Sequence, residues 1–144
     1  MQLPRSTFEL LFRASRLVNE RAIARVADGG GRLRPAHTAL FPHITSQGVR
    51  LSTLADRVGV TKQAIGPLID DLEQQGVVQR VDDPADRRAK LIRWTKKGER
   101  ALLHGLGVLA DLERDLARSI GKARMAALAD TLEALIGAVE ELPD

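Results

Sequence analysis

The stretch from residue 51 to 75 has the pattern of two short helices joined by one tight turn. Apolar residues at helical spacing run up to Gly59, and a second segment with the same periodicity begins at Thr61. Ala55 is small enough for two helices to approach, Gly59 is free to take a positive φ, and Ile65 can serve as a branched apolar wedge. These features predict a helix-turn-helix whose second helix covers residues 61–75.

Two β-prone runs follow this pair of helices, at residues 77–81 and 90–94. They come after Gly76, which suits the left-handed residue that often follows a helix C-terminus. The segment between the runs, residues 82–88, is longer than a minimal hairpin loop, so we expect a functional loop there. We expect residues 49–51 to form a brief strand in the same sheet. The fold class predicted is mainly α (α+β), a winged helix-turn-helix flanked by helices.

Helices are predicted on both sides of the winged helix. Residues 8–27 carry a broad apolar stripe at helical spacing, and three glycines at 29–31 end it. Pro35 is expected to open a second helix that reaches Ile44, with Pro42 kinking or shortening it. Ser52 and Thr61 are expected to cap the two helices that follow.

From Thr95 the chain reads as helical to its end, with a break at Gly121. Leucines recur at steps of three and four on both sides of that break, so we expect a helical hairpin with a long apolar seam. The predicted organisation is an N-terminal helix at 1–33, a DNA-binding lobe at 34–98 and a C-terminal helical hairpin at 99–144.

Composition narrows the class of protein. A chain of 144 residues fits one domain, or one compact lobe with helical extensions. Aliphatic side chains must fill the core because aromatics are 3%, and without cysteine there is neither a disulfide nor a thiol sensor. The first residues carry charges of both signs and do not resemble a signal peptide, and no segment approaches the roughly 18 apolar residues of a membrane span. We therefore expect a cytoplasmic protein without membrane contact.

The net charge of +3 is unevenly spread. Acidic residues outnumber basic ones after residue 100, which argues against indiscriminate coating of DNA. The sharpest basic excess lies on and after the wing loop. Such a run can be an ordinary solvated face, but at this place it more readily meets phosphate. Its members are Arg87, Arg88, Lys90, Arg93, Lys96, Lys97 and Arg100.

Three groups of residues resemble the multiple antibiotic resistance regulator (MarR) family. They are Leu54-Ala-Asp-Arg57, the run 70–76, and above all Asp83-Pro-Ala-Asp-Arg-Arg-Ala-Lys-Leu91 followed by Thr95-Lys-Lys-Gly98. The resemblance covers nearly the whole chain. It implies a homodimer that binds a pseudo-palindromic DNA operator as a transcriptional regulator, more often a repressor than an activator, released by a small ligand.

The residues expected to contact DNA lie at the start of the second helix and on the wing. Gln pairs well with adenine and Lys with guanine or phosphate, and a guanidinium suits a narrow minor groove. The resemblance favours Arg88 for insertion, with Arg87 as second choice and Asp86 holding the loop. Gly66-Pro67 departs from the family's usual Ser or Thr followed by Arg, and we expect the proline to bend the helix. The full set is Ser52, Thr61, Lys62, Gln63, Asp86, Arg87, Arg88 and Lys90.

Dimerisation is expected because, within one protomer, only the N-terminal helix is available to cover the leucine seam. Leaving this apolar surface in water would cost roughly 25 cal/mol per Å². A C2 dimer would place its recognition helices roughly 34 Å apart. If a ligand pocket exists, it should lie where the dimer helices meet the winged helix, although its aromatic residues could equally be plain core. The residues expected to line it are Phe8, Phe12, Arg16, His37 and Phe41.

Other functions fit the sequence less well. The histidines at 37, 43 and 104 are dispersed, and neither a nucleophile motif nor a phosphate-binding glycine loop occurs, so we expect no enzyme and no cofactor. A zinc sensor using His37 and His43 is disfavoured, because six residues on one helix put them on different faces. The alternative that stays open is a winged helix for protein contacts, or an architectural DNA binder without ligand control.

Overall fold

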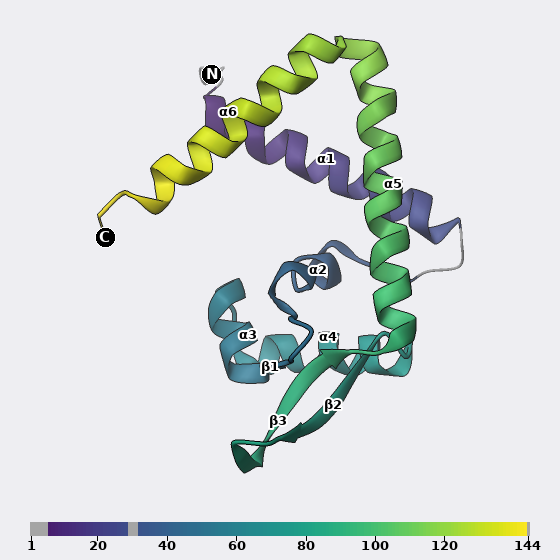
Figure 1. The fold of residues 1–144 in the computed structure, drawn as a ribbon, viewed down its shortest axis with the longest axis vertical. Coiled ribbons are helices and arrows are strands. Elements are labelled where there is room, and N and C mark those ends of the chain that lie inside the picture. Colours follow the sequence, from purple (N-terminus) through teal and green to yellow (C-terminus); the bar gives the residue numbers. More distant parts are fainter. Residues whose placement is uncertain (1–5, 29–31, 144) are drawn as a thin grey trace, which may run out of the picture. The chain divides into compact units, whose positions relative to one another are not determined.

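The computed structural model describes residues 6–28 and 32–143 of the chain. Within them lie six α-helices and a small three-stranded antiparallel sheet (Figure 1), so the predicted mainly helical winged-helix class is confirmed. The chain divides into two compact units between Leu106 and Gly107, and each unit is described by itself. The predicted division at 33 and 98 concerns function and stays a prediction.

Helix α1 (Thr7–Ala27) confirms the N-terminal helix. Ser6 caps it, because its hydroxyl accepts a hydrogen bond from the Glu9 backbone N–H at 3.1 Å. The glycines expected to end the helix lie outside the described residues. Much of the apolar stripe is exposed, including Phe8 at 55% and Phe12 at 71%.

The second predicted helix is shorter than expected. Helix α2 (Pro35–Thr38) begins with proline in its first turn and is followed by a 3-10 helix at Phe41–His43. Pro42, inside that 3-10 helix, has no N–H to continue an α-helix. The predicted continuation to Ile44 is therefore wrong, whereas the expected shortening at proline is confirmed.

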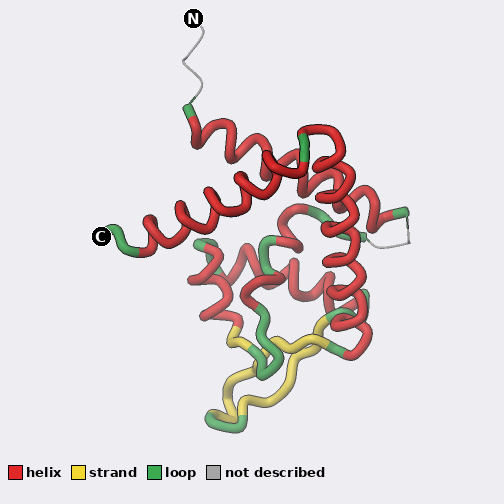
Figure 2. The backbone as a smooth tube through the Cα atoms, turned by 45° about the horizontal axis from the view of Figure 1, so that its top comes forward, coloured by secondary structure: helices red, strands yellow, loops and turns green. Residues whose placement is uncertain are grey.

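Strand β1 (Val49–Arg50) leads directly into α3 (Leu51–Val58), and α4 (Lys62–Gln74) follows after one turn. The sheet continues with β2 (Val78–Asp83) and β3 (Asp86–Trp94), in the order β1-β3-β2. Only Pro84 and Ala85 lie between β2 and β3, at the tip of the hairpin in Figure 2. The predicted long wing loop at 82–88 is therefore wrong, because both strands extend through its charged residues.

An aliphatic core joins α3, α4 and the sheet, as composition predicted. Trp94 packs edge-on against Phe41 with ring centroids 5.2 Å apart, and its indole Nε1 donates to the Ile44 carbonyl oxygen at 3.0 Å. These contacts fix the end of β3 to the segment that precedes β1. The buried cluster comprises Leu40, Ile44, Val49, Leu54, Ala55, Ile65, Ile69, Leu72, Val77, Val78, Ile92 and Trp94.

Helices α5 (Lys96–Ile120) and α6 (Lys122–Glu140) confirm the helical C-terminal part and its break at Gly121, whose φ is 100°. From that break the two helices diverge instead of packing along their length (Figure 1), so a closed helical hairpin is not formed. Many apolar side chains of this part are exposed, among them Leu109, Leu116, Leu128, Ile136 and Val139.

Candidate nucleic-acid interface

The turn between α3 and α4 has the geometry that the sequence predicted. Gly59 takes φ 76° and ψ 32°, and its N–H donates to the Ala55 carbonyl at 2.9 Å. A left-handed residue at this point ends α3 at once, which is why glycine suits it. Ala55 and Ile65 are buried beneath the turn. The first turn of α4 is thereby left on the surface.

Thr61, Lys62 and Gln63 are all exposed at this end of α4. The Thr61 hydroxyl accepts from the Ala64 N–H at 3.1 Å, which confirms it as the N-cap. Within the described residues, no hydrogen bond or ion pair engages the side chains of Lys62 and Gln63. Two polar side chains at a helix N-terminus are therefore available to an external partner.

Pro67 lies inside α4, and the helix continues through it to Gln74. Proline has no N–H, so the carbonyl of Gln63, four residues earlier, loses its helical partner. The space around Gly66 is open, with no heavy atom within 4 Å of where a Cβ would lie. The Gly66-Pro67 step therefore contributes neither a charged side chain nor a side-chain hydrogen-bond donor to this part of the helix surface.

Ser52 is not the cap that the sequence predicted. The capping position of α3 is Arg50, two residues earlier, so the helix begins at Leu51; Arg50 makes no side-chain capping bond. Arg50 is the last residue of β1, and pairing with β3 holds its backbone extended. The strand therefore decides where the helix starts, and Ser52 becomes a half-buried residue of the first turn.

The second half of α4 is acidic, and the wing compensates part of that charge. Arg80 of β2 lies 2.7 Å from an Asp70 carboxylate oxygen and 2.9 Å from one of Glu73. Partial burial acts to lower the pKa of Arg80, but the hydrogen bond to Asp70 and both carboxylate charges outweigh it and raise the pKa. These pairs fix α4 against the wing, and nothing in the sequence pattern had pointed to Arg80.

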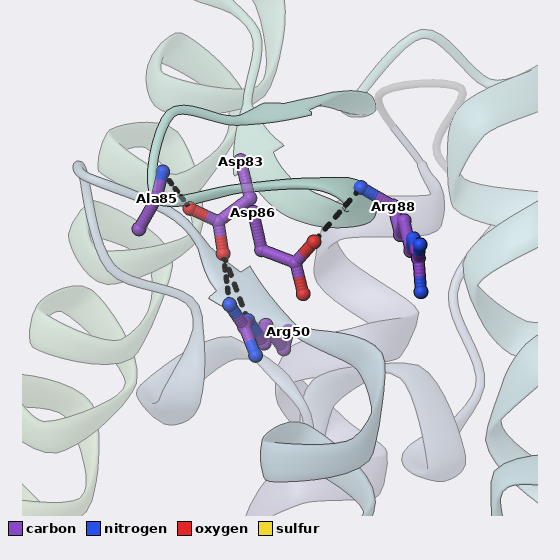
Figure 3. A network of polar contacts seen from close by, with 5 residues as sticks. All are labelled: Arg50, Asp83, Ala85, Asp86 and Arg88. Carbon is purple, nitrogen blue, oxygen red and sulfur yellow. Dashed lines mark hydrogen bonds and ion pairs between the residues drawn. The ribbon is translucent and has the colours of Figure 1, made fainter.

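The base of the wing depends on Asp83, also unforeseen from sequence. This buried carboxylate accepts from the Ala85 N–H at 2.9 Å and from Arg50 Nε and Nη2 at 2.8 and 2.6 Å (Figure 3). The Ala85 N–H and the Arg50 guanidinium hold the pKa of Asp83 below its usual value. Arg50 and Asp83 belong to β1 and β2, on opposite sides of β3, so only the sheet brings them together.

Arg87 and Arg88 lie at the start of β3, just after the two-residue turn, and not in a longer loop. Asp86 accepts from the Arg88 backbone N–H at 3.0 Å, as expected of a residue that holds this segment (Figure 3). Both arginines are exposed, and no described residue forms an ion pair or hydrogen bond with either guanidinium. Lys90 differs, because its ammonium pairs with Asp82 across the hairpin.

The five residues expected to line a ligand pocket lie in two environments. His37 is fully buried and Phe41 packs against Trp94, both beside the winged helix. On α1, Phe8 and Phe12 are exposed, and Arg16 pairs with Glu20 of its own helix at 2.8 Å. A pocket lined by all five stays a prediction.

The two histidines weighed as metal ligands lie on separate helices, since α2 ends before His43, and not on one helix as expected. No group of three or more His, Cys, Asp or Glu in the described part of the chain is arranged to hold a metal ion. Among the same residues, no helix is both long and apolar enough to cross a bilayer.

Comparison with known proteins gives one family. Residues 44–90, which hold the helix-turn-helix and most of the wing, match the model of the MarR family. No curated protein matches the chain.

Solved structures share the fold over most of the chain. A structure of MarR superimposes with a TM-score of 0.71 at 21% identity, covering 94% of this chain and 96% of that one. CouR from Rhodococcus jostii bound to p-coumaroyl-CoA gives 0.64 at 27%, covering 88% and 89%. The repressor CouR bound to a 23-mer DNA duplex gives 0.66 at 23%, covering 94% and 99%. Residues 44–90 thus match the MarR-family model, and the chain shares the fold of MarR over most of its length.

Proposed function

We propose that the protein is a homodimeric transcriptional regulator that binds a pseudo-palindromic operator in double-stranded DNA. The observation that carries the proposal is the distribution of unpaired polar groups on the winged helix. Lys62 and Gln63 at the start of α4, and Arg87 and Arg88 on the wing, are exposed and without partners among the described residues. The acidic side chains of α4 at Asp70 and Glu73 are instead paired with Arg80.

The first turn of α4 is proposed to enter the major groove. A recognition helix contacts base edges with its N-terminal residues, and Gln63 can bond an adenine edge while Lys62 reaches guanine or phosphate. The Thr61 hydroxyl accepts the capping hydrogen bond from the Ala64 N–H, so a contact from Thr61 to DNA must either leave that bond in place or replace it. Ser52 and Lys90 stay in the proposed contact set as phosphate contacts at its margin.

The wing is proposed to place Arg88 in the minor groove, with Arg87 on the phosphate backbone. A guanidinium is favoured in a narrow minor groove because the negative potential is strongest there. Asp86 and Asp83 fix the backbone from which these side chains project. The DNA-bound structure of CouR, whose fold this chain shares, supports DNA as the partner.

Dimerisation is proposed through α1, α5 and α6. Their exposed apolar side chains, such as Phe12 at 71% and Leu103 at 68%, would be costly to leave in water at roughly 25 cal/mol per Å². A closed twofold dimer buries the same surface on both subunits.

Control by a small molecule is proposed as the means of release from DNA, with the protein acting as a repressor. The complex of CouR with p-coumaroyl-CoA supports a ligand-binding role for a protein of this fold. Phe8, Phe12, Arg16, His37 and Phe41 are the residues we propose for the pocket. The architectural alternative predicts equal binding to all duplexes and no response to any ligand.

The wing is tested by operator affinity. Selection of duplexes from a randomised pool supplies the operator, and Arg88→Ala is expected to weaken its binding by about 1 to 3 kcal/mol. The matched control is Arg124→Ala, which removes the same charge from an exposed position of α6 and should leave affinity unchanged. Equal affinities for wild type and Arg88→Ala would remove the wing from DNA recognition.

Salt and competitor DNA separate the two candidate functions. With about 6 to 10 phosphate contacts, log affinity should fall linearly with log salt concentration. A repressor should prefer its operator to random duplex by roughly 10³ or more. A flat salt profile would favour a protein-binding winged helix, and a specificity ratio near one would favour an architectural role.

A further inference from the structure

A buried histidine links α2 to the proposed recognition helix. The His37 side chain is 1% exposed, and its two ring nitrogens face different elements. Nδ1 accepts a hydrogen bond from the Arg34 backbone N–H at 3.0 Å, which closes the first turn of α2. Nε2 lies 2.7 Å from an Asp71 carboxylate oxygen on α4. One side chain therefore contacts both the first turn of α2 and the middle of α4.

The bond at Nδ1 determines which ring nitrogen carries the proton. A nitrogen that accepts from a backbone N–H has no hydrogen of its own, so a neutral His37 must carry its proton on Nε2. That N–H faces the Asp71 carboxylate, a strong acceptor. The contact is close without being an aligned hydrogen bond. Its strength must then depend on how α4 lies against α2.

Asp71 stands between the two carboxylates by which Arg80 holds α4 to the wing. Asp70 and Glu73 pair with Arg80 of β2, while Asp71 turns to α2. The same turn of the recognition helix thus makes side-chain contacts with two separate elements, α2 and the wing. Loss of the α2 contact would leave the ion pairs with Arg80 as the remaining side-chain restraint on these carboxylates among the described residues.

Thr38, the residue after His37, connects α2 to α1. The Thr38 hydroxyl donates to the Asn19 side-chain oxygen at 3.2 Å and to the Pro35 carbonyl at 3.0 Å. Adjacent residues of α2 therefore hold α1 on one side and α4 on the other. A helix of four residues has little packing surface of its own, so such polar contacts set its position.

We propose that His37 is a positioning residue for DNA recognition, holding α4 through Asp71 at the angle that specific binding requires. This inference rests on the proposed DNA-binding function. It assigns His37 a role in addition to the proposed ligand contact. Because phosphate contacts tolerate small changes of helix angle and base contacts do not, loss of the pair should reduce specific binding far more than non-specific binding.

Two amide variants separate the contacts of the ring. His37→Asn places an amide oxygen near the position of Nδ1, so it keeps the bond from Arg34 and loses Asp71. His37→Gln places an amide nitrogen near the position of Nε2, so it keeps the contact with Asp71. We expect His37→Asn to bind the selected operator about tenfold more weakly, with random-duplex affinity within about twofold of wild type. His37→Gln should recover most of the loss.

Substitution of Asp71 tests the same contact from its partner. Because the Asp71 side chain is partly exposed, its removal opens no cavity in the core. Asp71→Ala should lose specific affinity as His37→Asn does, and the double variant should lose no more than either single one. Asp56→Ala is the control, because it removes an exposed carboxylate of α3 that has no partner among the described residues. The control should not lower the specificity ratio. Thermal unfolding confirms that each variant is folded.

A spectroscopic measurement tests the geometry without DNA. The ¹⁵N shifts of the His37 ring in the full-length protein should report a proton on Nε2 and none on Nδ1. Unchanged operator affinity in both His37→Asn and Asp71→Ala, equal losses on operator and random duplex, or a proton on Nδ1 would each overturn the positioning role. Failure of the wild type to retain any duplex would instead refute the proposed function, while the ring measurement would still report on the contact.

Discussion

The Thr-x-x-Gly motif at the start of α5 leads to a prediction that the structure makes quantitative. Thr95 joins the start of α5 to the two residues before β2, since its backbone N–H donates to the Val77 carbonyl at 3.1 Å and its hydroxyl to the Gly76 carbonyl at 2.5 Å. The same hydroxyl accepts from the Gly98 N–H at 2.9 Å. A Cβ on Gly98 would lie only 1.8 Å from the Val77 carbonyl oxygen. Alanine at this position therefore requires backbone movement.

The expected cost of Gly98→Ala follows from three contributions. Forcing extra volume into a packed contact costs about 1–3 kcal/mol. Moving the Val77 carbonyl also weakens its bond from Thr95, worth about 0.5–1.5 kcal/mol. The higher helix propensity of alanine offsets up to about 1 kcal/mol of this. We expect a net destabilisation of about 1 to 3 kcal/mol, which corresponds to about 3 to 9 °C in the midpoint of thermal unfolding for a chain of this size.

The assay is thermal and urea unfolding followed by circular dichroism at one fixed protein concentration, because dimerisation makes stability concentration-dependent. Gly105→Ala is the matched control, since it lies in the same helix with no heavy atom within 4 Å of the added Cβ. The control should be unchanged or stabilised by up to about 1 kcal/mol. If Gly98→Ala proves as stable as Gly105→Ala, the close approach to Val77 does not constrain this position.

Three further predictions concern single contacts, each measured by urea unfolding. Thr61→Ala should cost about 1 kcal/mol because it removes a helix cap, whereas Ser52→Ala should cost clearly less; equal losses would contradict the assignment of the α3 start. The Ala85 N–H and the Arg50 guanidinium hold the pKa of Asp83 below its usual value, so the stability this carboxylate provides is present above the usual pKa and is lost as pH falls through the lower folded pKa. Asp83→Asn should therefore lower stability at pH 7 and flatten its acid dependence, and an unaltered acid slope would exclude this contribution. Trp94→Phe should cost about 1–3 kcal/mol by leaving the buried Ile44 carbonyl unpaired, and a neutral effect would show that another donor replaces the indole.

Sequence alone predicted the elements whose causes are local. Gly59 and Gly76 both take positive φ, and Thr61 caps α4, because each feature depends on a few neighbouring residues. The same holds for the break at Gly121 and the shortening near Pro42. The predicted positions of Lys62 and Gln63 followed directly, since they are the first residues after a correctly placed cap.

Predictions failed where the tertiary structure supplied the deciding contact. Ser52 has the chemistry of a cap, but pairing of β1 with β3 holds Arg50 extended, so Arg50 takes the capping position two residues earlier. The wing loop was predicted too long because its charged residues have low β propensity. In the fold, Asp82 pairs with Lys90 across the hairpin and Asp83 accepts from Ala85, so the strands extend to a two-residue turn.

The pattern of helices, the glycine turns and the winged-helix topology were thus determined by the sequence itself, through periodicity and capping that act over about four residues. Only the tertiary structure decided which charges are paired and which are free. Arg50 with Asp83, Arg80 with Asp70 and His37 with Asp71 join residues far apart in the chain. Their partners depend on strand register and helix packing, which local periodicity does not specify.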